Sequence, residues 1–235
     1  MSELYIILGT AMLLGFSHTI LGPDHYIPFI VLSKARNWKL SKTMWITFFS
    51  GVGHIVGSVV LGIIGVTLGI SVAKLESVEA IRGDIAAWML MIFGTFYTVY
   101  GINKVLKKGM HSHLPKFLFP KSIRNYRHFT DEEIKKDIVN ENKLTPWVLF
   151  LIFVFGPCEV LIPMLIYPAA KHDMIGVFSV AGLFGLTTIA TMMSAVFIGY
   201  KGVSFVVFKE AHKYFHVIAG LIVLFMGVGI LFLGF

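Results

Sequence analysis

The sequence predicts an all-α integral membrane protein with six transmembrane helices, arranged as two inverted three-helix repeats with a broken first helix in each. Composition, six apolar runs and a repeated motif predict this fold. Of the 235 residues, 56% are hydrophobic and 14% are charged, whereas a soluble domain usually carries about 25% charged residues. Each run is close to the roughly 20 residues that a helix needs to cross the hydrocarbon core.

The predicted spans follow one another along the chain, with one polar insertion between the third and the fourth. They cover residues 4–32, 45–70, 85–105, 146–170, 175–200 and 214–235. The chain therefore divides into a first three-helix repeat (1–105), a basic loop (106–145) and a second repeat (146–235). Within the loop, Thr130 as N-cap and Glu133 three residues later predict a short helix.

A motif in the first span recurs 134 positions later. Gly22-Pro23-Asp24-His25 aligns with Gly156-Pro157-Cys158-Glu159, and each copy runs on into a further proline. At the same offset, or one less, Gly51 matches Gly185 and Gly94 matches Gly227. Because each unit has an odd number of spans, the second unit enters the membrane upside down. Inverted repeats of this kind place a binding site near the midplane, on discontinuous helices. The alternative is chance similarity between apolar segments.

Basic residues in the loops predict the orientation. Seventeen lysines and arginines lie on the side of the loop 106–145, whereas the opposite side has only Lys74, Arg82 and Lys171. By the positive-inside rule, this multi-pass protein of the cell membrane has both termini outside and its long loop in the cytoplasm. The net charge of +7 does not indicate nucleic acid, because the basic residues are spread between apolar runs.

Acidic and imidazole groups inside the spans indicate a site. A carboxylate within a span, such as Asp24 or Glu159, costs about 2.5 to 3.5 kcal/mol on the insertion scale. Such groups are stable when they are paired, hydrated or bound to a cation. Histidine and carboxylate ligands suit Ni²⁺, Co²⁺ or Zn²⁺. The candidate metal ligands are Asp24, His25, His54, Glu159, His18 and Cys158.

Proline at position 23 opens the first helix because it lacks an amide donor, and Gly22 permits the bend. On a continuous helix, His18 and His25 would lie about 10 Å apart, so both can bind one ion only if the break folds the chain back. His18 is otherwise a supporting residue or part of the access path. The alternatives are a kink used only for packing, with Asp24 bonded to backbone, and His54 satisfied by partners in the core.

Two motifs resemble a known family. His18 followed by Asp24-His25, and Phe48-Phe49-Ser50 followed by Gly53-His54, are similar to the nickel/cobalt transporters of the NiCoT and NicO types, in the superfamily of LysE-like exporters. The resemblance implies a secondary transporter that moves a divalent transition metal by alternating access, and not an enzyme. The metal would be substrate, with no tightly bound cofactor. Titratable histidine and glutamate would allow coupling to protons.

Two other functions stay open. Gly156-Pro157-Cys158 is similar to the Pro-Cys motifs of transmembrane thiol-disulfide carriers related to cytochrome c maturation, which use a pair of cysteines, one from each repeat. Here Asp24 occupies the position equivalent to Cys158, so no internal disulfide can form. An exporter of a small anion or organic solute is the third possibility. The expected partners are a divalent metal ion and the lipid bilayer, without nucleic acid; a homo-oligomer is compatible with the sequence.

Overall fold

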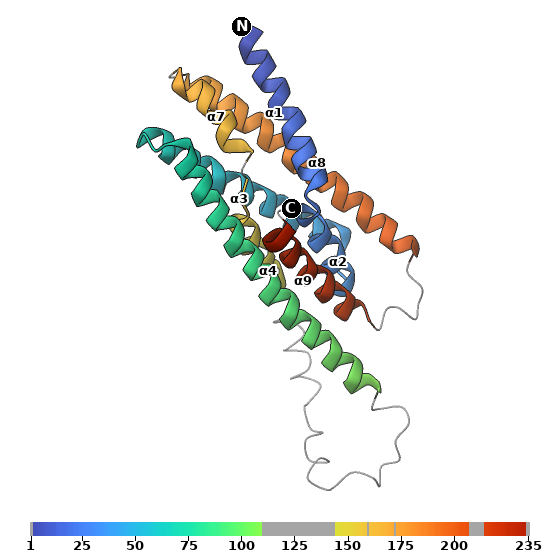
Figure 1. Cartoon of the computed structure of the whole chain (residues 1–235). Helices are drawn as coiled ribbons and strands as arrows, with labels where there is room; N and C mark the ends of the chain where they lie inside the picture. Colours follow the sequence, from blue (N-terminus) through green and yellow to red (C-terminus); the bar gives the residue numbers. More distant parts are fainter. Residues whose placement is uncertain (1, 110–143, 159, 172, 207–213, 234–235) are drawn as a thin grey trace, which may run out of the picture.

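The computed structural model describes residues 2–109, 144–158, 160–171, 173–206 and 214–233, and every regular element in these ranges is helical (Figure 1). Five of the helices are long and apolar enough to cross a membrane. The predicted all-helical, multi-pass membrane protein is therefore confirmed. Glu159 and the predicted helix at Thr130 lie outside the described residues.

The helices follow the predicted spans with one large difference in extent. They are α1 (Ser2–Leu21), η1 (Pro23–His25), α2 (Ile27–Ala35), α3 (Leu40–Thr67), α4 (Val72–Gly109), an unlabelled helix (Leu144–Phe155), α7 (Leu161–Ala170), α8 (Met174–Val206) and α9 (Phe215–Leu233). The first and fourth spans are interrupted at Pro23 and Pro157, as predicted. The third span was predicted to begin at residue 85, but its helix begins at Val72 and so includes charged turns before the apolar run.

Two of the helices end in left-handed residues. After α2, Asn37 has a φ of 52° and the Trp38 amide donates to the Ser33 carbonyl at 2.8 Å. After α3, Gly69 has a φ of 64° and the Ile70 amide donates to the Gly65 carbonyl at 2.8 Å. A left-handed residue lets the chain turn while the last carbonyls of the helix stay bonded.

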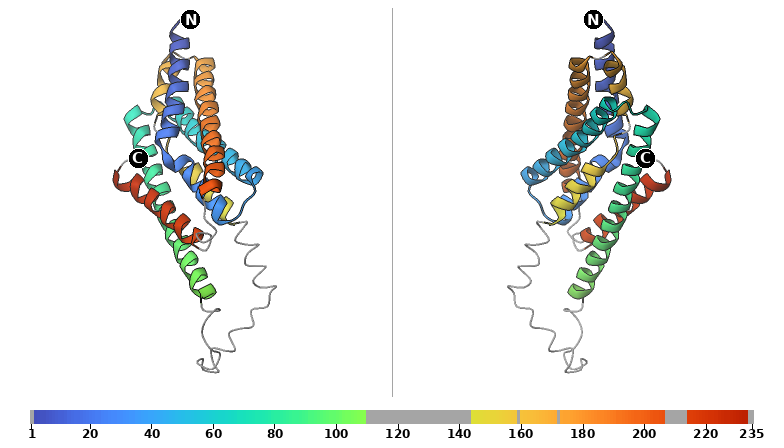
Figure 2. Two further views of the ribbon diagram at one scale, coloured as in Figure 1. Left: turned by 90° about the vertical axis from the view of Figure 1, so that its right-hand side faces the viewer. Right: turned by 90° about the vertical axis from the view of Figure 1, so that its left-hand side faces the viewer.

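The helices pack in two pairs, and the short α2 contacts one helix of each pair. Helix α4 lies along α9, and α1 lies along α8, which also crosses α3 (Figures 1 and 2). Helix α2 contacts both α8 and α9, and its side chains Phe29 and Leu32 are fully buried. The short α2 therefore lies inside the bundle.

An exposed ion pair joins the start of α1 to the end of α7. Lys171 Nζ lies 2.7 Å from Glu3 Oε2, and the Tyr167 hydroxyl donates to the same oxygen at 2.6 Å. The hydrogen bond to Glu3 raises the pKa of Lys171, which follows α7, above its ordinary value. Because both charged groups face solvent, the pair serves below as a control for a buried one.

Glycine allows α4 and α9 to approach closely, and substitution there is expected to destabilise the bundle. A methyl group on Gly94 would lie 2.7 Å from Leu224 Cα, a backbone atom that cannot give way. We expect Gly94→Ala to lower the free energy of unfolding in detergent by about 1 to 3 kcal/mol, the usual cost of overpacking. Gly182→Ala in α8 is the matched control, because nothing lies within 4 Å of that position. Equal effects of the two substitutions would contradict the close crossing.

Candidate functional site

The break after α1 is a single tight turn. The Gly22 amide donates to the His18 carbonyl at 2.9 Å, and the His25 amide donates to the Gly22 carbonyl at 3.1 Å. Pro23 has no amide hydrogen, so the α-helical pattern stops there. A methyl group on Gly22 would lie 2.7 Å from His25 Nδ1 and 2.9 Å from Asp24 Oδ1. Glycine at this position therefore leaves room for the side chains of the turn.

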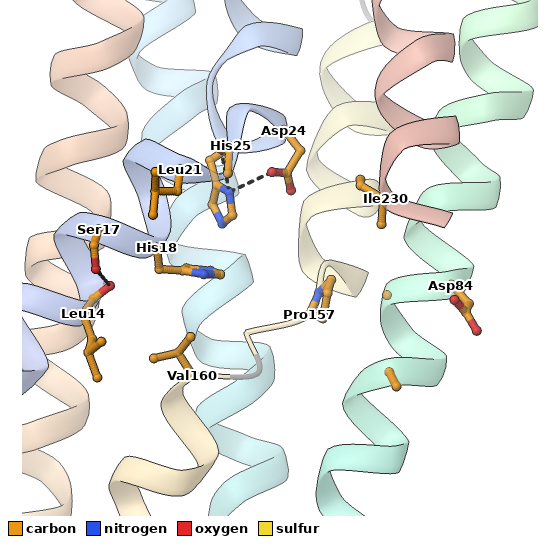
Figure 3. A pocket seen from close by; sticks show the side chains of 13 residues that line it. Leu14, Ser17, His18, Leu21, Asp24, His25, Asp84, Pro157, Val160 and Ile230 are labelled. Atoms are coloured by element: carbon orange, nitrogen blue, oxygen red, sulfur yellow. Dashed lines mark hydrogen bonds and ion pairs between the residues drawn. The ribbon is translucent and has the colours of Figure 1, made fainter. Parts of the chain in front are cut away.

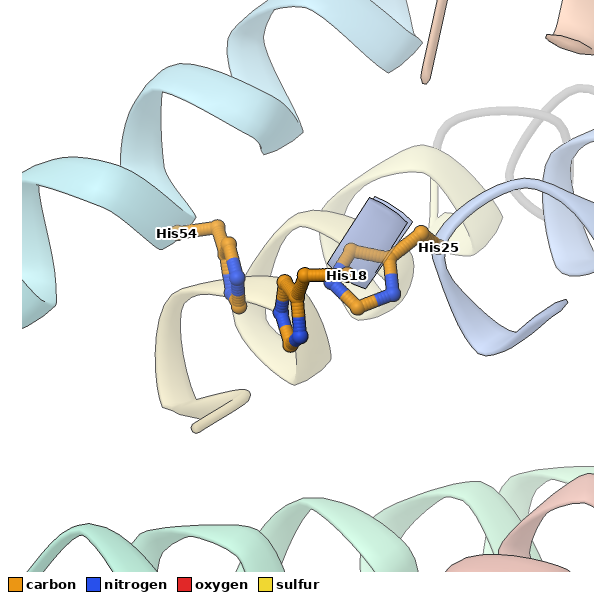
Figure 4. A group of neighbouring side chains, drawn as sticks. All are labelled: His18, His25 and His54. Atoms are coloured by element: carbon orange, nitrogen blue, oxygen red, sulfur yellow. The ribbon is translucent and has the colours of Figure 1, made fainter. Parts of the chain in front are cut away.

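The turn brings three histidines together, from α1, η1 and α3 (Figure 4). The ring centroids of His18 and His25 are 4.7 Å apart, and those of His25 and His54 are 5.2 Å apart. One ring nitrogen from each residue lies within 4.8 Å of the other two. A continuous helix could not have placed His18 and His25 so close.

Oxygen atoms fix the orientation of two of these rings. His25 Nδ1 lies 3.1 Å from the Gly22 carbonyl and 3.2 Å from Asp24 Oδ1. His54 Nδ1 lies 3.2 Å from the Phe153 carbonyl. Because carbonyl and carboxylate oxygens accept hydrogen bonds, Nδ1 carries the donated hydrogen in both rings. In all three histidines Nε2 is buried and has no hydrogen-bond partner among the described residues.

A cavity of about 590 Å³ opens beside the cluster (Figure 3). His18, His25 and Asp24 line one side of it, and Pro157 lies opposite them. The two helix breaks thus meet across one cavity. A smaller space of about 40 Å³, lined by His25, His54, Gly156 and Pro157, continues toward α3. Asp84 of α4 is exposed and also lines the larger cavity.

Cys158 follows the second break but does not line either cavity. The side chain is fully buried in an apolar cluster with Ala11, Ile55 and Leu161. Its amide donates to Glu79 Oε2 at 3.0 Å. Among the described candidates, His18, His25 and His54 form a group that could hold one metal ion, and Cys158 is not a member of that group.

Sequence reasoning missed Glu79 and Arg82. Glu79 is fully buried, and Arg82 donates to its Oε1. The other Arg82 nitrogen donates to the Val154 carbonyl at 2.8 Å and to the Gly156 carbonyl at 3.3 Å. Arg82 was assigned to an external loop, but it lies in α4 and bonds to carbonyls at the second break. The signal available was the Glu-x-x-Arg spacing, which places the two side chains on one helix face.

The model of the family described as "Cytochrome C biogenesis protein transmembrane region" matches residues 27–229. No curated protein and no solved structure matches the chain. The resemblance to nickel/cobalt transporters was therefore wrong, and so was the function of metal transporter derived from it. Of the two short motifs that carried that resemblance, His18…Asp24-His25 lies before the matched residues, whereas Gly156-Pro157-Cys158 lies within them.

Proposed function

Because this chain belongs to the family of cytochrome c biogenesis transmembrane proteins, we propose that it passes reducing equivalents at the membrane by thiol-disulfide exchange at Cys158. The chain acts as a carrier and not as an enzyme. The family match across residues 27–229 carries this proposal, because it includes the Gly-Pro-Cys break and its only cysteine.

The second sulfur of the exchange has to come from a partner protein, because the chain has one cysteine. The Cys158 thiolate attacks a partner disulfide, so that one S–S bond breaks, a mixed disulfide forms, and the released sulfur takes a proton. A dithiol partner attacks the Cys158 sulfur of the mixed disulfide and releases the first partner's second thiol. The second thiol of the dithiol partner then displaces the Cys158 sulfur and closes a disulfide within that partner. Two electrons pass from the dithiol to the first disulfide.

Exchange requires the Cys158 side chain to move, since it is fully buried. Pro157 and Val160, on either side of Cys158, already line the 590 Å³ cavity. A local movement at Cys158 would therefore bring the thiol to this cavity. The bonds from the Cys158 amide to Glu79 and from Arg82 to the Gly156 carbonyl oppose this movement.

The inverted repeat that we propose is supported by reciprocal contacts between α4 and α9. A methyl group on Gly94 would meet Leu224, and one on Gly227 would meet Met91 at 2.7 Å. Met91 and Leu224 are themselves equivalent at the offset of 133 that relates the two glycines. Reciprocal contact of equivalent positions is the property of a two-fold interface.

Helices α3 and α8 repeat this pattern at the offset of 134. A methyl group on Gly51 would meet Ile189 at 3.2 Å, and one on Gly185 would meet Ile55 at 2.9 Å. Residue numbers rise along α3 as they fall along α8, so the two helices run antiparallel. An antiparallel, self-complementary crossing supports two units of opposite orientation in the membrane.

The orientation is also a proposal, with both termini outside and the loop 106–145 in the cytoplasm. The charge distribution of the sequence supports it, with seventeen lysines and arginines on the side of the loop against three on the opposite side. By the positive-inside rule, the side that is rich in basic residues is cytoplasmic. Labelling of single cysteines placed in the loop and at the N-terminus, in intact cells, tests it directly.

The experiment that tests the function uses the full chain in sealed vesicles, with a dithiol protein outside and a disulfide reporter inside. We expect reduction of the reporter at a rate well above that of protein-free vesicles. A rate equal to that of protein-free vesicles, from correctly folded protein with both partners present, would count against the proposal.

A further inference from the structure

We propose that His18, His25 and His54 form a binding site for a copper(I) ion, where α1, η1 and α3 meet. This site goes beyond the proposed function, because ion binding needs neither Cys158 nor a partner thiol. It also differs from the ligand set expected from the sequence, in which carboxylates bind the metal directly.

The unpaired nitrogens carry the inference. Nε2 of all three histidines is buried and has no hydrogen-bond partner among the described residues. A buried polar atom without a partner is costly, because it has lost its hydrogen bonds to water. Three such atoms in one place point to a shared ligand, and one bound cation would satisfy all of them.

The geometry suits a single ion. One ring nitrogen from each histidine lies within 4.8 Å of the others. Imidazole nitrogens bind a first-row metal at about 2.0 to 2.1 Å, so three of them around one ion are about 3.5 Å apart. Small rotations of the rings close that difference, and the adjacent 40 Å³ space beside His25 and His54 allows such rotations.

The Nδ1 nitrogens of His25 and His54 already have hydrogen-bond partners, as in known metal sites. Histidine ligands usually donate their other N–H to a carboxylate or a backbone carbonyl. His25 Nδ1 has both, from Asp24 and Gly22, and His54 Nδ1 has the Phe153 carbonyl. Asp24 is therefore a positioning residue for His25 and not a metal ligand.

Charge balance selects the ion. Three neutral imidazoles add no charge, so the nearest charge is that of Asp24, 3.2 Å from His25 Nδ1. A monovalent ion makes the group neutral, whereas a divalent ion leaves a net positive charge in a medium of low dielectric, where unbalanced charge is costly. Asp84 is solvent-exposed and Glu79 is paired with Arg82, so neither alters this balance. Among the metals that imidazole suits, copper has the monovalent state.

The binding test uses the purified full chain in detergent, titrated with Cu(I) against a chelator and analysed for metal content. We expect one copper per chain. His18→Leu should weaken binding at least tenfold, and Asp24→Asn should weaken it about 10- to 100-fold, as loss of an outer partner does. His216→Gln is the matched control, because Tyr97 and Lys104 already occupy its two ring nitrogens. Its affinity should equal that of the wild type.

X-ray absorption of the copper-loaded chain identifies the ligands. The expected shell holds three nitrogens and no sulfur, and it should be unchanged in Cys158→Ser. Sulfur in the shell, tighter binding of Zn²⁺ than of Cu(I), or no retained copper in monodisperse protein would each overturn the site. If copper binds but the vesicles transfer no reducing equivalents, the proposed function falls and this site stands. If the vesicles transfer reducing equivalents but the chain binds no copper, the copper site falls and the proposed function stands.

Discussion

Cys158→Ser is expected to reduce the transfer of reducing equivalents to the rate of protein-free vesicles. The chain has no other sulfur that can attack a disulfide, because its one cysteine is Cys158. A serine hydroxyl fits the same space but does not exchange with disulfides, since the thiolate is the nucleophile. The measurement is reduction of the disulfide reporter inside vesicles that hold equal amounts of each variant.

The controls separate loss of chemistry from loss of fold. Cys158 packs in an apolar cluster, so Cys158→Ala is the second variant, because it adds no polar group to that cluster. Asp24→Asn should keep more than about half of the wild-type rate, since Asp24 contacts His25 and not the thiol. Full activity of both cysteine variants would exclude thiol exchange at this residue.

The positions of the helix breaks could be predicted because they depend on local chemistry. Pro23 and Pro157 remove amide donors wherever they stand in a helix, and the structure breaks its helices at both. The start of α4 could not be predicted from hydropathy in the same way. Glu79 and Arg82 look like loop residues in the sequence, and only their contacts with the second break explain why Glu79 is fully buried and Arg82 partly buried.

The histidine cluster was predictable in membership but not in geometry. Sequence separation gives about 10 Å between His18 and His25 on a straight helix, whereas their ring centroids are 4.7 Å apart. The difference arises from the tight turn at Pro23, whose course depends on neighbouring helices. The contact between Asp24 and His25 Nδ1 was not predictable either, because it depends on that turn.

Arg82→Met is expected to lower the free energy of unfolding by about 3 to 5 kcal/mol, the usual cost of leaving one charge of a buried pair uncompensated. Glu79 is fully buried, and once the arginine is gone its Oε2 still accepts from the Cys158 amide but its charge has lost the Arg82 cation. The carbonyls of Val154 and Gly156 lose their donor as well. Unfolding of the purified variant in mixed micelles measures the effect.

The matched control is Lys171→Met, which removes the cation of the exposed pair with Glu3 and should leave stability unchanged within error, because surface pairs contribute little. The double variant Glu79→Gln, Arg82→Met should recover part of the loss, since no charge is then buried alone. If the Glu79–Arg82 pair holds the second break closed, Arg82→Met should also raise the rate of maleimide labelling at Cys158 at least tenfold. Labelling as slow as in the wild type would mean that the pair stabilises the bundle without restraining Cys158. Other contacts would then have to restrain the movement proposed for thiol exchange.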